Sequence, residues 1–302
     1  MDFMQRIKSF QPELTRTQAK IADYILANPD SVCFLSLNKL AEEIGVTELT
    51  ILNFCKKTGF DSFVKLKNEL FQYLQERIFW NNKLETSSEQ YDEDDSMFAD
   101  LQKNQRDLIE TTFDNLHNGE LRQFVATLSE ADHIYICGHE ASFLIAANLQ
   151  HKLSNGSANA SLIDVSNYSD VLDMLSCAGE RDVFVLITMP FYSAQTVVIS
   201  DYLGSIGATV LAMTDKISSP IVKNARHVLL CNSTNLVFHN SIASMIAVSD
   251  VVASLYFLHN KERFRAYNEK VKAIEKFFKS SEIPAYHNEY FFNSDAAATR
   301  EI

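Results

Sequence analysis

The sequence predicts an all-α helix-turn-helix domain followed by an α/β three-layer sandwich with a five-stranded parallel sheet. Residues 1–83 show only helical apolar periods, whereas from about Ala131 short β-rich runs alternate with helical stretches. The segment 84–97 between them is polar, acidic and without apolar periodicity, which is typical of a linker. We expect a helical domain, a linker, an α/β domain and a tail, at residues 1–83, 84–104, 105–280 and 281–302.

The helix-turn-helix prediction rests on residues 37–56. Ser36 can cap a first helix, and Gly45 can end it because glycine accepts a positive φ at a tight turn. Thr47 can cap a second helix, whose buried side would include Ile51. This order of caps, turn and apolar positions is that of a helix-turn-helix, in which the second helix enters the major groove of DNA.

The same register predicts the outward face of the second helix. Its N-terminus and Thr47 can donate to a phosphate, Asn53 can read adenine, and the two lysines at its end suit backbone phosphates. A helical hairpin used only for protein packing would show the same pattern, so that alternative stays open. The predicted contacts to a double-stranded DNA operator are Thr47, Glu48, Leu49, Leu52, Asn53, Lys56 and Lys57.

The net charge of −12 does not exclude DNA binding, because it is unevenly distributed. Residues 1–80 hold ten Lys/Arg and ten Asp/Glu. Residues 81–302 hold the remaining 17 Lys/Arg and 29 Asp/Glu, which account for the whole net charge. A neutral first domain can bind DNA if its basic residues share one face, but it gains no long-range steering.

Composition excludes several other classes of protein. There is no apolar run long enough for a transmembrane helix, and the N-terminus has no apolar signal region. The five cysteines are scattered without a CxxC pair, which predicts neither a disulfide framework nor a zinc site. No Ser–His–Asp grouping, metal cluster or Walker sequence is seen. We expect a cytoplasmic protein with no membrane contact, metal, cofactor or catalytic residue.

The strand predictions are mostly apolar rather than alternating, as expected for parallel strands that helices cover on both faces. One strand ends in the stretch Tyr135–Ser142, a strand–Gly–helix turn of the kind that often holds a phosphate in α/β proteins. This turn carries Glu140, an unfavourable charge for that role. The predicted strands are 133–137, 160–164, 182–188, 208–213 and 227–231.

Several segments in residues 14–70 carry a family resemblance. IADYILANP, SLNKLAEEIGV, FCKKTGF and a closing F–LK segment together resemble the N-terminal domain of the RpiR family of bacterial transcriptional regulators. That family continues with a sugar isomerase (SIS) domain, and residues of about 105–260 fit this pattern through IYICGHEAS, DVFVLITMPFYSAQT and GATVLAMTDKISSPIVKNARHVLLC. The resemblance implies a DNA-binding regulator with a sugar-type effector. Family members usually carry a basic residue near the position of Asn53, so the preferred DNA sequence is unassigned.

The resemblance also implies two ligand loops. The first usually reads Gly-x-Gly-x-Ser, and this chain keeps Gly138 and Ser142 but has Glu140 for the second glycine. If Glu140 faces the ligand, it repels an anion about 4 Å away by roughly 4 kcal/mol at an effective dielectric of about 20. If it points to solvent, it stabilises the following helix N-terminus instead. Both interpretations stay open.

The second family loop usually reads Ser-x-Ser-Gly-x-Thr, which aligns its ends with Thr188 and Ser193. Pro190, which lacks an N–H, and the bulky Phe191 stand where serine and glycine would be. We therefore hypothesise a sugar or polyol effector that is not strongly anionic. The predicted ligand contacts are Gly138, Glu140, Ser142, Thr188, Tyr192, Ser193, His239 and Ser241.

Two other functions stay open beside regulation. A sugar-phosphate isomerase would need a general base, for which His139, Glu140 and His239 are candidates. A domain that has lost its ligand would serve only as an interaction module. The fused helix-turn-helix favours regulation by a homodimer or homotetramer. Residues 98–116 and 243–258 are either subunit contacts or core of one subunit.

Overall fold

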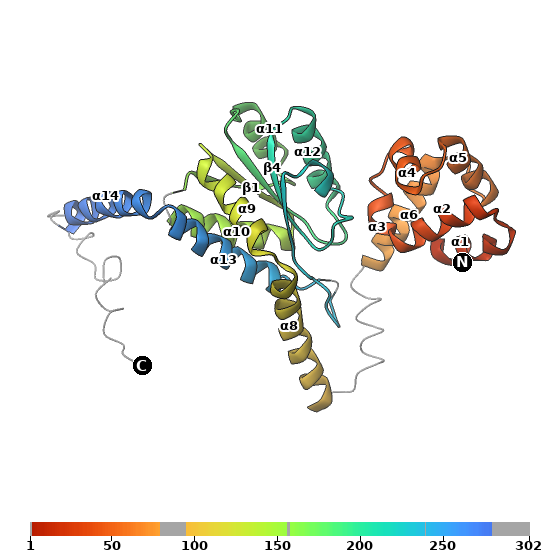
Figure 1. Cartoon of the computed structure of the whole chain (residues 1–302), viewed down its shortest axis with the longest axis horizontal. Coiled ribbons are helices and arrows are strands. Elements are labelled where there is room, and N and C mark those ends of the chain that lie inside the picture. The colour runs from red at the N-terminus through yellow and green to blue at the C-terminus, as the bar shows by residue number, and fades with distance from the viewer. Residues whose placement is uncertain (1, 79–94, 156–157, 239, 280–302) are drawn as a thin grey trace.

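The computed structural model describes residues 2–78, 95–155, 158–238 and 240–279, and in it an all-helical domain lies beside an α/β domain (Figure 1). The apolar faces of the N-terminal helices meet in one core, in which Ile21, Leu40 and Phe54 are fully buried. These helices are α1 (Phe3–Phe10), η1 (Gln11–Glu13), α2 (Arg16–Ala27), α3 (Pro29–Val32), α4 (Leu37–Ile44), α5 (Glu48–Lys57) and α6 (Phe63–Ile78).

The helix-turn-helix forms as predicted, because each helix end has the local partner that it needs. Ser36 Oγ accepts the backbone N–H of Lys39 at 3.2 Å and caps α4. Gly45 then adopts a left-handed φ of 71° and ends α4. Thr47 Oγ1 caps α5 by accepting the N–H of Thr50 at 3.2 Å.

The α/β domain is built on the predicted five-stranded parallel sheet, with strand order β2-β1-β3-β4-β5. Helices alternate with its strands along the chain. The elements are α8 (Asp95–Asn115), α9 (Asn118–Glu130), β1 (Ile134–Gly138), α10 (Ala141–Asn155), β2 (Ala160–Asp164), α11 (Tyr168–Cys177), β3 (Val183–Ile187), α12 (Ala194–Ser205), β4 (Thr209–Thr214), η2 (Val222–Asn224), β5 (His227–Leu230), α13 (Ala243–His259) and α14 (Lys261–Lys279).

Each face of the sheet has its own hydrophobic core. Side chains of β1 alternate between them, with Ile136 packed beneath α9, α10 and α13 and Cys137 packed beneath α11 and α12. All five residues of β1 are buried, which explains why the strand is apolar without alternation. The fold class is therefore a helical domain followed by a three-layer sandwich, as the sequence predicts.

Two helices refine the sequence-based expectations. Residues 95–104, expected in the linker, form the first half of α8, whose Phe98 is 54% exposed. In contrast, α13 contributes Met245, Val248 and Tyr256 to the core of its own domain. Within 243–258, core packing of one subunit therefore accounts for most of the apolar residues.

Among the helices that the structure describes, none combines the length and apolarity needed to cross a bilayer.

Candidate functional site

The predicted DNA-contacting residues of α5 lie on one accessible surface. Thr47, Glu48, Leu49, Asn53, Lys56 and Lys57 are all exposed, and Leu49 keeps 64% of its surface accessible. Leu52 differs from the prediction, because it is half-buried and packs against the domain core. Lys57 Nζ donates to the carbonyl of Glu13, so Lys57 is held by a neighbouring segment. The exposed set still combines a helix N-terminus, an amide and two cations.

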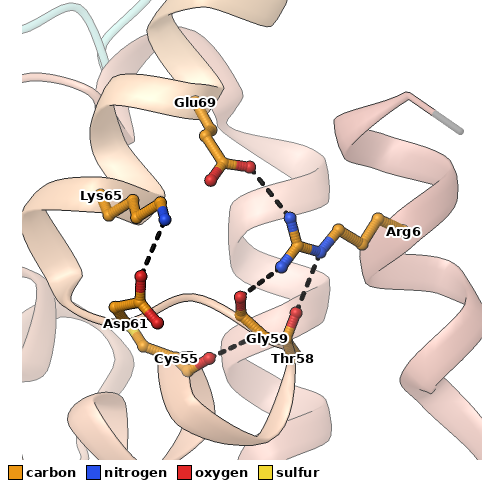
Figure 2. A network of polar contacts seen from close by, with 7 residues as sticks. All are labelled: Arg6, Cys55, Thr58, Gly59, Asp61, Lys65 and Glu69. Atoms are coloured by element: carbon orange, nitrogen blue, oxygen red, sulfur yellow. Dashed lines mark hydrogen bonds and ion pairs between the residues drawn. The ribbon is translucent and has the colours of Figure 1, made fainter.

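A network around Arg6 anchors the other end of α5, as Figure 2 shows. Arg6 Nε donates to the carbonyl of Thr58 at 3.1 Å, and another guanidinium nitrogen donates to the carbonyl of Gly59. Nη1 reaches Glu69 Oε2 in α6 at 3.0 Å, and the guanidinium lies 4.1 Å from the centre of the Phe60 ring. The network joins α1, the turn after α5, and α6. Sequence reasoning missed Arg6 because all its partners are distant in the chain.

The two predicted ligand loops meet at the carboxyl edge of neighbouring strands. β1 and β3 pair side by side, while α10 and α12, which follow them, cover opposite faces of the sheet. Such a point in an open α/β sheet leaves a crevice outside the strand ends. Gly138 lets the start of α10 approach β1, since a Cβ there would lie 2.6 Å from the carbonyl oxygen of Ser142. Ser142 itself is buried in the first turn of α10.

Glu140 adopts a backbone conformation that is unusual for a residue other than glycine. Its φ is 49°, in the left-handed region that favours glycine. Its side chain is 83% exposed, and Oε1 lies 3.7 Å from Nε2 of His139. On the other side of this imidazole, Nδ1 lies 3.9 Å from Oδ1 of Asp164, because Asp164 pairs with Gly138 at the end of β2. Two carboxylates therefore flank His139 in the first loop.

Asp164 is held as an anion. Its Oδ1 accepts the N–H of Ser166 at 2.9 Å and the hydroxyl of Ser166 at 2.7 Å. These bonds, with a smaller contribution from His139, hold the pKa of Asp164 below its usual range. The first loop thus presents negative charge. Sequence reasoning singled out Glu140 but not Asp164, which only the pairing of β1 with β2 brings here.

The second loop is closed by its own hydroxyl groups. Thr188 is 2% exposed, and its Oγ1 accepts the N–H of Ser193 at 3.4 Å. Ser193 Oγ caps α12 by accepting the N–H of Thr196 at 3.3 Å and donates to Gln195 Oε1 at 3.1 Å. Both predicted contacts therefore already shape the turn.

Tyr192 lies in the hydrophobic core beneath α11 and α12. It is 3% exposed and donates from its hydroxyl to Asp215 Oδ1 at 2.7 Å. Burial raises the pKa of Asp215, and the hydrogen bond from Tyr192 opposes that rise. Lys216 Nζ lies 5.9 Å from the centre of the Tyr192 ring. Asp215 and Lys216 follow β4 and carry no sequence signal of their own.

A third segment reaches this edge from between β5 and α13. Asn240 Nδ2 donates to the carbonyl of Pro190 and so joins this segment to the second loop. Ser241 is buried, and its Oγ donates to Gln105 Oε1 of α8 at 2.9 Å. His239, the other predicted contact here, lies outside the described residues.

Two buried polar atoms near the β1/β3 edge make no hydrogen bond within the described part of the chain. They are Nδ1 of His139, in the first loop, and Oγ1 of Thr196, in the first turn of α12. Buried polar groups are normally paired, so unpaired ones at this edge of the sheet are candidate ligand contacts. No cluster of His, Cys, Asp or Glu suited to a metal ion occurs among the residues that the structure places.

Family models match both parts of the chain. A model described as a helix-turn-helix domain of the rpiR family matches residues 1–77, and a SIS domain model matches residues 127–258. The first match contains α1–α5 and nearly all of α6, whereas the second contains the whole parallel sheet.

Proteins with similar sequences align over most of this chain, across both domains. A protein of Haemophilus influenzae described as an uncharacterized HTH-type transcriptional regulator is 29% identical over 84% of this chain and 88% of its own. A protein of Caldanaerobacter subterraneus with the same description is 27% identical over 91% of this chain and 95% of its own.

Solved structures share the fold at lower identity. The Vibrio vulnificus NanR protein complexed with ManNAc-6P is 16% identical and aligns over 91% of this chain and 99% of its own, with a TM-score of 0.61. The sugar isomerase domain of an RpiR transcription factor from Sphaerobacter thermophilus is 20% identical and aligns over 58% of this chain and 97% of its own, with a TM-score of 0.55.

Proposed function

This chain joins a helix-turn-helix domain of the rpiR family to a SIS domain, and from that premise we propose that it is a bacterial transcriptional regulator controlled by a small sugar-type effector. The observation that carries the proposal is the accessible surface of α5, where Asn53, Lys56 at the end of the helix, and the helix N-terminus capped by Thr47 are all exposed. These groups suit base edges and phosphates of a double-stranded operator. Both relatives described above are HTH-type transcriptional regulators by name.

DNA binding can be tested without knowing the operator. The full-length protein would select duplexes from a random library, and the affinity of the selected duplex would be measured at several salt concentrations. We expect a selected motif with two-fold symmetry and an affinity that falls steeply with salt. Failure to enrich any sequence would contradict DNA-binding regulation.

The proposed effector is a sugar or polyol whose binding does not depend on a phosphate group. The support is the charge of the first loop, where Glu140 and the anionic Asp164 flank His139. In the second loop, Pro190 offers no N–H and Phe191 replaces a small residue. Ser142, Thr188, Ser193 and Ser241 would supply hydroxyl groups if the ligand rearranges their present bonds. His139 and Thr196 would gain partners for atoms that are now unpaired.

Calorimetry with matched pairs of free and phosphorylated sugars tests this preference. We expect the free member to bind more tightly, because the anionic Asp164, and to a smaller extent the exposed Glu140, repel a phosphate. Glu140→Gln should narrow the difference between the two members. Micromolar binding of a phosphosugar that Glu140→Gln leaves unchanged would contradict the preference, and no binding of any sugar would favour an interaction module.

We place the SIS domain among binding domains rather than isomerases. His139 is its best-placed general base, yet Nδ1 lies 3.9 Å from Asp164, beyond hydrogen-bond distance, and Glu140 is exposed. Turnover assays with ketose and aldose phosphates decide this point. Robust turnover that His139→Ala abolishes would establish an isomerase.

The active form is a homodimer or homotetramer, in which α8 contributes a subunit contact. Its N-terminal half extends away from the sandwich in Figure 1, and it carries the exposed Phe98. Analytical ultracentrifugation should show dissociation for Phe98→Asp but not for Val198→Asp, a matched change on α12 at a side chain that is 68% exposed. Equal masses for the two variants would remove α8 from the interface.

A further inference from the structure

The second ligand loop lies against the helix-turn-helix domain. Phe191 belongs to the turn after β3, yet it is half-buried and packs against the core of the N-terminal domain. Conversely, Phe34 of the N-terminal domain, which follows α3, packs against the SIS core beneath α11 and α12. Two aromatic side chains thus cross the junction between the domains.

Polar groups surround the same junction. Ser31 of α3 is 4% exposed, and its Oγ donates to the carbonyl of Ser218 in the turn after β4 at 2.5 Å. Lys67 of α6 donates to the carbonyl of Leu35 at 2.9 Å. Burial lowers the pKa of Lys67, and the nearby charge of Lys223 in the SIS domain also acts to lower it. The contacts across the junction therefore involve both the turn after β3 and the turn after β4.

The residues on both sides of Phe191 are tied to the effector domain. The carbonyl of Pro190 accepts from Asn240, and the hydroxyl of Tyr192 donates to Asp215. A ligand that rearranges Thr188 or Ser193 must therefore displace a turn whose central side chain packs against the N-terminal core.

The junction leaves the candidate DNA surface accessible. Its N-terminal side includes Ser31 of α3 and Phe34, whereas Asn53 and Lys56 of α5 remain exposed. Docking therefore fixes the direction of α5 relative to the SIS domain without covering it.

We propose that the turn 188–193 is the docking surface for the helix-turn-helix domain, and that Phe191 couples the effector site to the orientation of α5. The proposal rests on the proposed function and adds a direct side-chain contact as the route of control. A two-fold dimer binds both halves of a palindrome only when its recognition helices have the right spacing. Docking should therefore strengthen binding to a palindrome and leave binding to one half-site unchanged.

The first test measures hydrogen exchange of residues 29–35 in the full-length protein without ligand. Phe191→Ala should speed exchange in this segment several-fold, whereas Phe191→Leu should retain most of the protection. Tyr168→Ala is the matched control, because this aromatic residue of α11 is 74% exposed. Unchanged exchange in a folded Phe191→Ala protein would overturn the docking proposal.

The second test uses a duplex that the wild-type protein selects from a random library, together with a single half-site of it. Phe191→Ala should weaken palindrome binding by about tenfold and half-site binding by less than about twofold, because the linked second contact loses effective concentration. Equal effects on both duplexes would overturn the coupling. If the wild-type protein selects no DNA, the proposed function fails, while the exchange test still decides docking.

A reversible cross-link covers the case in which Phe191→Ala does not fold. Ser31→Cys with Ser218→Cys should form a disulfide under oxidising conditions, because the Ser31 hydroxyl already bonds the backbone carbonyl of Ser218 and so holds the two segments together. The single Ser31→Cys variant controls for pairing with Cys33. We expect the oxidised double variant to keep full palindrome affinity. Absence of the cross-link, or a loss of palindrome affinity that reduction reverses, would overturn the proposal.

Discussion

The two candidate surfaces of this molecule hold their polar groups in opposite ways. On α5, Asn53 and Lys56 are exposed and their helix is fixed from behind by Arg6. At the β1/β3 edge, Thr188 and Tyr192 are buried and already bonded to neighbours. A preformed exposed face suits a large rigid partner such as DNA. A buried, bonded edge can accept a small ligand only by exchanging hydrogen bonds, which makes it suited to a conformational response.

The largest expected effect is on DNA binding by the exposed surface of α5. Lys56→Ala with Lys57→Ala should weaken binding to every duplex by about tenfold or more, and should reduce the salt slope by about 2 because each phosphate contact contributes about 0.9. Lys56 should account for more of the loss, since Lys57 already donates to Glu13. Fluorescence anisotropy over a salt series measures both quantities. Lys103→Ala with Lys270→Ala is the matched control, and an equal loss there would show that only net charge matters.

The next effect concerns Arg6, which anchors the turn after α5 to α1 and α6. Arg6→Ala should lower the free energy of unfolding by about 1–3 kcal/mol, because it removes three hydrogen bonds from a charged group and the contact with Phe60. Arg6→Lys should rescue little, since an ammonium lacks the planar fork. Denaturant titration measures the change. Arg265→Ala, at a pair exposed by 72% and 84%, should have almost no effect, and a similar loss there would refute the anchoring role.

The hydrogen-bonded pair of Tyr192 and Asp215 tests the buried groups at the β1/β3 edge. Tyr192→Phe leaves Asp215 without its main hydrogen bond, so its pKa, already raised by burial, should rise further. A carboxyl whose pKa is raised by folding contributes stability below its unfolded pKa, and this is lost as the pH rises through the folded pKa. The variant should therefore lose about 1–2 kcal/mol more stability than wild type as the pH rises above the usual pKa of a carboxyl, about 3.9. Thermal unfolding over this range measures it, with Tyr168→Phe as the control; parallel curves for the variant and wild type would contradict the pairing.

A smaller change separates structure from ligand contact at Ser193. Ser193→Ala should cost about 1 kcal/mol, because it removes the cap of α12, whereas Ser193→Asp should retain the cap. If Ser193 also contacts the effector, both variants should weaken sugar binding in calorimetry. Unchanged sugar binding in the Asp variant would confine Ser193 to capping.

The smallest effect concerns the backbone of Glu140. Glu140→Gly should stabilise the protein by up to about 0.5 kcal/mol, because relief of left-handed strain slightly exceeds the entropy that glycine adds to the unfolded chain. Glu140→Ala keeps the backbone strain but removes the charge. Comparing it with Glu140→Gly therefore measures the effect of the backbone strain alone. Chemical denaturation of the three proteins measures the order, and an alanine variant as stable as the glycine variant would contradict the strain.

The features that could be predicted from the sequence are those set by residues close together in the chain. Ser36, Gly45 and Thr47 act on neighbouring backbone groups, so the helix-turn-helix follows from adjacent residues. The strands likewise follow from apolar runs. In contrast, the partners of Arg6 and the approach of Asp164 to His139 depend on segments far apart in the chain. Periodicity and caps carry no signal for such contacts.

The hydrogen bond from Ser31 to Ser218 spans 187 positions of the chain and has a consequence for synthesis. At about 5–20 residues per second, a ribosome needs roughly 10–40 s to make the chain between these residues. For most of that interval, the helices that form the N-terminal core have been made, up to Leu74, but the partner turn does not yet exist. Every new molecule therefore passes through a stage in which its recognition helix is made and its means of control is not.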